Sequence, residues 1–333
     1  MIYGTDDVGF YIEFKSKSRE VGNIRQEFEL RAKQLYEKND NIILSISGGL
    51  DSQIMLHSFL TQGLSVKTSF MHYGKYNDNE LSHIKKLDEK YGIKTEIIVI
   101  DPTEHYQELK NQALKYDILS PYALLHGKYL SMIPEDYVFI QAQGPDLYSQ
   151  TFTNRDTKKT YFAASYYDNT VSRYRAFNIH KRKNESIFFP NFEEHLLSLM
   201  NDDVFSTSLC ISDYWTDKKS QDSFKTKTGT IKRDTIWDKY TKPFIFGKYW
   251  KNELMYFPKF AGLENLMDVF KDFGPGIISE DGQISFTYNE DIKKSIVMIP
   301  IKELYDILNS NDNITKKYYL NIPQYYVDKR LNK

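Results

Sequence analysis

The sequence is very short of cysteine, because Cys210 is the only one in 333 residues. One cysteine excludes an intrachain disulfide framework, a Cys-rich zinc or iron–sulfur site, and any chemistry that needs a cysteine pair. An apolar run of about 18 residues is also missing, and the first residues show no basic segment followed by an apolar one. We therefore predict a cytoplasmic protein that does not enter the membrane.

An excess of charge of either sign is missing as well. Lys and Arg total 44 against 45 Asp and Glu, which gives a formal net charge of −1. A nearly neutral chain has no global electrostatic reason to bind nucleic acid, so nucleic acid is not expected as a partner. The hydrophobic fraction of 41% is ordinary for a globular protein, and the length is sufficient for two domains.

Two common nucleotide-binding signatures do not occur. The Gly-Lys pairs at Gly74, Gly127 and Gly247 are each followed by Tyr, where a Walker loop requires Ser or Thr, and there is no GxGxxG fingerprint. The seven histidines show no metal-ligand spacing, and we interpret most of them as ordinary surface or helix residues. His57 and His72 are the two that stand near enough to a candidate site to border it.

A regular alternation of strand and helix patterns is present between residues 41 and 142. The apolar runs typical of buried strands are at 41–46, 64–70, 94–100 and 137–142. Helical patterns separate them, for example at 52–60 and 77–91. Mostly apolar strands that alternate with helices indicate a parallel sheet covered on both faces, which is a doubly wound α/β fold.

The pattern differs on both sides of this stretch. Residues 1–40 are typical of an N-terminal extension with one strand and one helix, and the strand–helix alternation ends at about residue 150. Later helix patterns are at 193–200, 250–257, 262–272 and 300–310. We predict three parts, namely the extension at 1–40, an α/β domain at 41–150 and a mostly helical substrate or lid region at 151–333.

The segment SGGLDS, Ser47 to Ser52, directly follows the first apolar strand and begins a helix. Its two glycines permit positive φ and close backbone approach, so successive N–H groups can point into one concavity. The helix N-terminus adds partial positive charge, and the two serine hydroxyls can donate to phosphate oxygens. Asp51 would be repelled by a bare phosphate, which indicates a Mg²⁺ ion between the carboxylate and the phosphates. We predict a polyphosphate site with its metal rather than a simple tight turn.

A second polar segment, QGPD at residues 143–146, follows the fourth apolar strand. Ligands of parallel α/β sheets bind beyond the carboxyl ends of the strands. We therefore expect this segment and SGGLDS to face the same crevice.

These residues resemble the signature of the PP-loop ATP pyrophosphatases, which use ATP to adenylylate a carbonyl or carboxylate oxygen and release pyrophosphate. The pattern SGG-x-DS is matched at each fixed position, and Leu50 at the variable position resembles the asparagine synthetase branch. Three more stretches resemble that branch, at 77–100, at 141–148 (QAQGPDLY) and at 238–250 (DKYTKPFIFGKYW). The resemblance implies a PP-loop, HUP-like ATP-binding domain at 41–150, with ATP and Mg²⁺ as cofactors.

The resemblance also implies a role for each matching residue. Asp51 and Asp146 would hold Mg²⁺, and Gln143 stands where some members carry a Glu that can act as a base. Lys242, with Lys239 as its rival, would neutralise charge while the adenylate forms and pyrophosphate departs. The loop would hold the phosphates, and the backbone at the end of the second strand would meet the adenine. The residues implied to bind the nucleotide are Ser45, Ser47, Gly48, Gly49, Leu50, Asp51, Ser52, Ser69, Phe70, Met71 and Gly144.

The chain departs from the asparagine synthetase branch at two places. Ile2 follows Met1 where the glutamine-using members have a catalytic Cys, so we expect no glutaminase in this chain. It would need free ammonia, an amine substrate, or a separate glutaminase or amine-donor partner. Leu147 replaces an acidic residue of the second motif, so the small carboxylate that serves as substrate is unassigned.

The leading prediction is an AMP-forming ligase that joins a carboxylate to ammonia or an amine as an amide. One alternative is a PP-loop enzyme that modifies a nucleobase or tRNA. The other is a catalytically silent PP-loop fold that serves as a binding or structural module.

Overall fold

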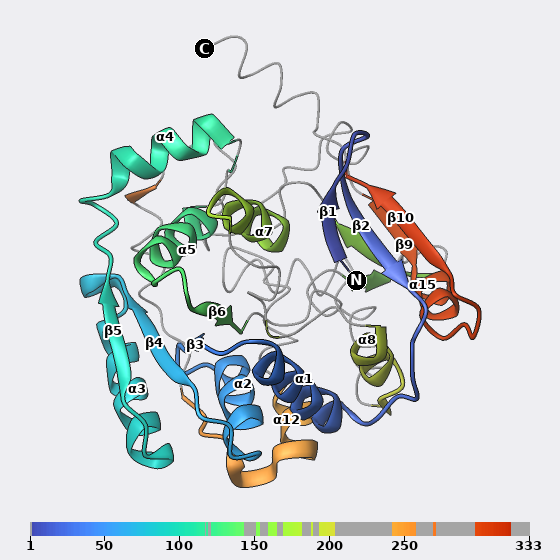
Figure 1. Ribbon diagram of the computed structural model, residues 1–333, viewed down its shortest axis with the longest axis horizontal. Helices are drawn as coiled ribbons and strands as arrows, with labels where there is room; N and C mark the ends of the chain where they lie inside the picture. The colour runs from blue at the N-terminus through green and yellow to red at the C-terminus, as the bar shows by residue number, and fades with distance from the viewer. Residues whose placement is uncertain are drawn as a thin grey trace, which may run out of the picture.

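The computed structural model in Figure 1 describes most of the first 142 residues and several later segments. The described residues are 2–116, 118, 121–142, 151–153, 159–164, 169–181, 188, 193–203, 242–257, 269–270 and 297–320. The strands are β1 (Ile2–Thr5), β2 (Phe10–Lys15), β3 (Ile42–Ser45), β4 (Lys67–His72), β5 (Thr95–Val99), β6 (Val138–Gln141), β7 (Thr151–Thr153), β8 (Thr160–Ala164), β9 (Val297–Pro300) and β10 (Thr315–Tyr319). The helices are α1 (Ile24–Lys38), α2 (Leu50–Leu60), α3 (Asp78–Tyr91), α4 (Tyr106–Tyr116), α5 (Pro121–Met132), α7 (Asn169–Ile179), α8 (Glu193–Met200), α12 (Lys242–Trp250) and α15 (Ile301–Leu308), with short 3-10 turns η1 (Gly74–Tyr76) and η4 (Lys251–Glu253).

Four strands form a parallel sheet in the order β5-β4-β3-β6. The chain runs from β3 through α2 to β4 and through α3 to β5, and then returns by α4 and α5 to place β6 on the other side of β3. Ser45 of β3 is in register with Ser69 of β4 and with Gln141 of β6. The strand order therefore reverses between β3 and β6, which is where ligands bind in sheets of this kind.

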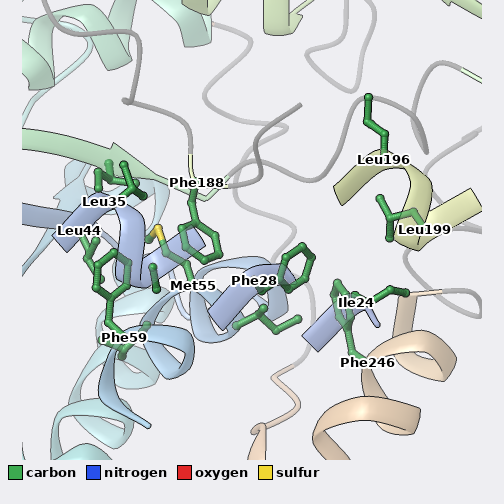
Figure 2. Packing of buried hydrophobic residues seen from close by; sticks show 14 of the residues in the cluster. Ile24, Phe28, Leu35, Leu44, Met55, Phe59, Phe188, Leu196, Leu199 and Phe246 are labelled. Atoms are coloured by element: carbon green, nitrogen blue, oxygen red, sulfur yellow. The ribbon is translucent and has the colours of Figure 1, made fainter. Parts of the chain in front are cut away.

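Both faces of the parallel sheet are covered. Ile42 and Leu44 of β3 pack in one buried cluster, whereas Ile43, which points the other way, packs in a second cluster. Helices α1 and α2 lie on the first face, and α5 and α7 lie on the other (Figure 1). Figure 2 shows Phe28 of α1 and Phe59 of α2 within the first cluster. The predicted doubly wound α/β fold is confirmed.

Two antiparallel sheets lie beside the parallel one in the part of the chain that the structure describes. Their strand orders are β1-β2-β10 and β7-β8-β9. In β2 the side chains of Phe10, Ile12 and Phe14 are buried and alternate with partly exposed ones, as expected for a strand with one face on the core. The predicted strand and helix of residues 1–40 are thus present as β2 and α1.

The region after residue 150 contains strands as well as the predicted helices. Helices α8 and α15 match the patterns at 193–200 and 300–310, whereas β7 to β10 were not predicted. These strands are only 3 to 5 residues long, and such a length carries little periodic signal. The division of the chain at residues 40 and 150 stays a prediction.

The helix predicted at 250–257 is wrong. Helix α12 ends at Trp250, and Lys251 has a left-handed φ of 45° that an α-helix does not accept. The backbone of Met255 bonds to the side chain of Gln53 on α2 instead of to a helical neighbour. Of the pattern at 262–272, only residues 269–270 belong to the described part. Within that part, no helix has the length and apolar character needed to cross a membrane.

Candidate functional site

The loop between β3 and α2 depends on glycine. Gly48 has a φ of +77°, which an L side chain rarely adopts, and a Cβ atom there would lie 2.8 Å from the Cβ of His83 on α3. Gly49 is the residue before the first turn of α2 and has an extended backbone. Ser47 and Gly49 are exposed, whereas Gly48 is buried. The loop therefore presents bare backbone at the N-terminus of a helix, as predicted for SGGLDS.

The two serines of the loop have different roles in its structure. The hydroxyl of Ser52 donates to the Gly49 carbonyl at 2.8 Å and accepts from the backbone N–H of Ser47 at 3.2 Å. The hydroxyls of Ser47 and Ser52 are 3.5 Å apart. Ser52 is buried and closes the loop, so the exposed Ser47 is the serine better placed to meet a ligand. Phosphate binding by both hydroxyls stays a prediction.

Asp51 lies in the first turn of α2, next to these serines. Its carboxylate and the serine hydroxyls are hard oxygen donors, which suits Mg²⁺, an ion commonly bound by one or two carboxylates together with substrate phosphates. Among the described residues, no group of three or more His, Cys, Asp or Glu side chains gathers to hold a metal. The second predicted ligand, Asp146, lies outside those residues, so the metal site stays a prediction.

Several other predicted residues also fall outside the described part. Gln143, Gly144 and Lys239 belong there, and of Lys242 only the backbone is described, as the first residue of α12. Leu50 is partly buried against the first hydrophobic cluster, which indicates a packing role.

The end of β4, predicted to meet adenine, is already engaged in the sheet. The buried hydroxyl of Tyr129 on α5 donates to the Ser69 hydroxyl at 2.5 Å, and burial raises the pKa of Tyr129. The Ser69 carbonyl accepts from the Ile46 N–H at 2.9 Å, and the Met71 carbonyl accepts from the Asn77 side chain at 2.9 Å. Phe70 packs in the first cluster. Contact of this strand with adenine stays a prediction.

Gln53 on α2 is a site residue that no sequence pattern indicated. Its side chain is fully buried, and its amide nitrogen donates to the carbonyls of Gly48 at 2.8 Å and Met255 at 2.7 Å. Its amide oxygen accepts from the Met255 N–H at 2.8 Å. The sequence gives no signal for this contact, because Gln53 reads as an ordinary helix residue and its partner is 202 positions away.

His57, one of the two histidines that the sequence singled out, contacts the segment after α12. Its Nε2 lies 2.6 Å from a Glu253 carboxylate oxygen, and the same carboxylate accepts two hydrogen bonds from Arg25 on α1. Burial lowers the pKa of His57, and the hydrogen bonds from Arg25 lower the pKa of Glu253. The other, His72, lies 2.8 Å from the Asp78 carboxylate at the start of α3.

Glu80 lies beside the carboxyl end of β4, in the first turn of α3. Burial raises the pKa of this carboxyl to about 7, and the Asn77 amide, 3.2 Å away, opposes the shift by donating to it. Asn77 also fixes the strand end, because it accepts from the Tyr73 N–H at 2.6 Å. A carboxyl that titrates near neutrality at this edge of the sheet is a candidate functional group.

Gln141 is the last residue of β6 and is only 3% exposed. Neither its amide nitrogen nor its amide oxygen has a hydrogen-bond partner within the described residues. Leaving such a buried group unsatisfied costs roughly 1–3 kcal/mol, so a polar partner at this strand end would be stabilising. Gln141 stands next to Ser45 in register, at the point where the strand order reverses.

Residues 41–127 match a family model described as Queuosine biosynthesis protein QueC. Over 77 residues the chain is 38% identical to the 7-cyano-7-deazaguanine synthase of Sulfurihydrogenibium sp. (strain YO3AOP1), which is 23% of this chain and 34% of that relative. The chain thus matches only about a third of the length of this curated relative. The matches support the predicted resemblance of residues 41–127 to PP-loop ATP pyrophosphatases, whereas the likeness to the asparagine synthetase branch stays a prediction.

Among solved structures, the chain is similar to the structure of NMN synthetase from Francisella tularensis. The identity is 12%, the match covers 71% of this chain and 99% of the other, and the TM-score is 0.32. A similarity of this size has no weight for fold or chemistry.

Proposed function

We propose that this chain is an ATP-dependent, AMP-forming ligase that adenylylates a carboxylate and then joins the activated carbon to ammonia or an amine. The observation that carries the proposal is the loop Ser47–Ser52. It has a glycine-dependent backbone, stands at the N-terminus of α2, and lies where the parallel sheet reverses its strand order. The sequence match over residues 41–127 supports the same class of chemistry.

The residues of the loop would act on the phosphates of ATP. Backbone N–H groups and the N-terminus of α2 attract an anion, and the exposed Ser47 hydroxyl can donate to it. A carboxylate oxygen of the substrate attacks the α-phosphorus, the bond to the β-phosphate oxygen breaks, and pyrophosphate leaves. The amine nitrogen then attacks the acyl carbon, loses a proton, and AMP leaves. Mg²⁺, held by Asp51 and Asp146, would supply further charge neutralisation of the phosphates.

The segment that begins at Lys242 is attached to this loop. Helix α12 leads into η4, and the chain then reaches Met255, which is hydrogen-bonded to Gln53 beside Gly48. The attachment supports a role for this segment next to the phosphates. Under the proposal, Lys242 neutralises charge as pyrophosphate departs, an electrostatic contribution of roughly a few kcal/mol.

A second candidate substrate is favoured by the curated relative. Its name describes a synthase of a cyano-substituted deazaguanine, so the activated group in this chain would sit on a nucleobase-like ring rather than on an amino acid. The same adenylylation chemistry would serve both substrates, and the product would be an amide or a nitrile.

The experiment is a pyrophosphate-release assay with Mg-ATP and two substrate pools, each with and without ammonium. One pool holds amino acids and other small carboxylates, and the second holds carboxylated nucleobases. Ammonium-dependent release with the first pool supports the leading proposal, and release with the second pool favours the second candidate. Binding of Mg-ATP without release in either pool would contradict the ligase and favour a silent binding fold.

A further inference from the structure

We infer that Gln53 is a positioning residue that fixes the orientation of the Gly48–Gly49 peptide, and that the segment Lys251–Phe257 holds Gln53 for this purpose. The inference rests on the proposed function, because it treats the loop as the site of pyrophosphate. It adds a residue outside SGGLDS to the machinery and links that machinery to a distant part of the chain.

The hydrogen bonds around the Gln53 side chain show which end of its amide is the nitrogen and which is the oxygen. A primary amide offers two N–H donors on one side and an oxygen acceptor on the other. Its nitrogen donates to the Gly48 and Met255 carbonyls, and its oxygen accepts from the Met255 N–H. The backbone of Met255 bonds to both the nitrogen and the oxygen of the amide, so it determines that the nitrogen faces Gly48.

This arrangement determines which way the Gly48–Gly49 peptide points. In a trans peptide the C=O and the following N–H point in opposite directions, and the described chain has no cis peptide. The Gly48 carbonyl is held inward by the buried Gln53, so the Gly49 N–H points outward, on the side where Ser47 and Gly49 are exposed. An outward N–H attracts phosphate oxygens, whereas an outward carbonyl would repel them.

The orientation of the Gly48–Gly49 peptide must be fixed by a hydrogen bond from outside the loop. Glycine residues on both sides of one peptide allow it to rotate at little steric cost. The hydrogen bonds of Ser52 fix the Gly49 carbonyl and the Ser47 N–H, but they do not touch the Gly48–Gly49 peptide itself. Among the described side chains, Gln53 is the one bonded to the Gly48 carbonyl.

The segment Lys251–Phe257, which bonds to Gln53, also contacts the surrounding helices through other side chains. Glu253 pairs with His57 of α2 and with Arg25 of α1. Phe257 stacks on His83 of α3, with ring centroids 4.2 Å apart and an interplanar angle of 11°. His83 is also the residue that a Cβ on Gly48 would strike. The segment thus touches three helices around the loop, and its placement sets the conformation of the loop.

The test compares variants of Gln53, near the start of α2, and of Gln62, which lies just beyond the end of α2. Gln53→Met keeps the approximate shape of the side chain but removes every hydrogen-bonding group. Gln62→Met is the matched control, because the Gln62 amide also donates to two carbonyls, those of Glu29 and Ser58 at 2.7 Å, but lies beyond the far end of the helix. Calorimetric titration with Mg-pyrophosphate and Mg-ATP measures binding, and thermal unfolding without ligand measures stability.

We expect both methionine variants to lose stability, but only Gln53→Met to weaken binding, by about tenfold or more, the effect typical of losing one oriented donor. Wild-type affinity in a folded Gln53→Met variant would overturn the inference and leave the proposed function intact. Absence of binding by the wild-type chain would instead overturn the proposed function, and the inference with it.

Gln53→Glu keeps the test decisive if the methionine variant does not fold. An ionised carboxylate there faces two carbonyl oxygens without a donor, whereas its protonated form can donate to one of them. We expect its affinity for Mg-pyrophosphate, taken relative to the wild-type chain in the same buffers, to recover as the pH falls. A ratio that is constant with pH would count against a positioning role.

Discussion

The parallel sheet is built from one continuous stretch of chain, β3 to β6, whereas the antiparallel sheets join segments that are far apart. Lys15 of β2 pairs with Thr315 of β10, and Phe162 of β8 pairs with Ile299 of β9. Parallel strands all end at the same edge, so their polar end residues gather there, while antiparallel strands end at alternate edges. We therefore expect the chemistry at the edge of the parallel sheet, whereas the antiparallel sheets join distant segments of the chain.

The largest effect is expected from Asp51→Ala in the loop. Loss of this carboxylate should reduce pyrophosphate release by about a thousandfold or more, since several kcal/mol of charge stabilisation depends on it. Stability should change less than activity, because Asp51 is partly buried in the first turn of α2 and is not part of the hydrophobic core. Asp101→Ala is the control, since Asp101 also follows a parallel strand but caps a turn through the Thr103 N–H at 2.7 Å. Equal losses of activity in both variants would contradict the assignment.

A large loss of stability without a loss of affinity is expected from Phe14→Ala in β2. Phe14 is fully buried, and its ring contacts those of Phe162 and Tyr318 at centroid distances of 5.9 Å. Its removal should lower the free energy of unfolding by about 3 kcal/mol, measured by denaturant titration. The folded fraction should still bind Mg-ATP with wild-type affinity, and weakened binding would show that the two regions are coupled. Tyr36→Ala, at an exposed aromatic, should change little.

Glu80→Gln should stabilise the protein in a pH-dependent way. The pKa of Glu80 in the folded state, about 7, is above the ordinary glutamate value of 4.5. The folded state therefore binds more protons between these values and loses stability as the pH rises. At about pH 8 the neutral amide should gain about 1–2 kcal/mol after allowance for solvent screening, and near pH 4.5 the gain should vanish. Melting temperatures across this range measure it, and a gain that is constant with pH would refute the assignment.

The opposite sign is expected for Glu303→Gln in the antiparallel region. Glu303 is paired with Lys316, which lowers its pKa, and it accepts from the Tyr318 hydroxyl at 2.7 Å. Its contribution is therefore present above the unfolded pKa and is lost as the pH falls through the folded pKa. The variant should be slightly less stable than wild type at neutral pH, by less than about 1 kcal/mol, and the difference should shrink in acid. The two variants therefore distinguish a buried carboxyl beside the candidate site from an ion pair between α15 and β10.

The same comparison explains what the sequence could predict. The strand β3 and the helix α2 follow from an apolar run and a helical pattern within 20 residues of each other, and both are present. The pairing of β2 with β10 could not be predicted, because β10 is TKKYY, mostly exposed, and its partner is about 300 positions away. Local periodicity reveals elements, but it does not reveal which distant elements pair.

Some residues of the candidate site could be predicted from the sequence, and others could not. The loop Ser47–Ser52 was visible because its bare backbone and Asp51 are adjacent in sequence. Gln53 was not visible, because its role arises only when Met255 is brought against it. That contact also explains the wrong helix prediction at 250–257, since a backbone that bonds to Gln53 does not complete a helical turn. Long-range hydrogen bonds therefore account for both the missed residue and the missed helix end.

The central claim is that this loop serves pyrophosphate release, and the products of ATP test it most directly. Phosphorus NMR of Mg-ATP incubated with the chain, ammonium and the substrate pools should show AMP and pyrophosphate in equal amounts, and neither should form with Asp51→Ala. Formation of ADP and orthophosphate, or AMP formation that persists in Asp51→Ala, would contradict the account.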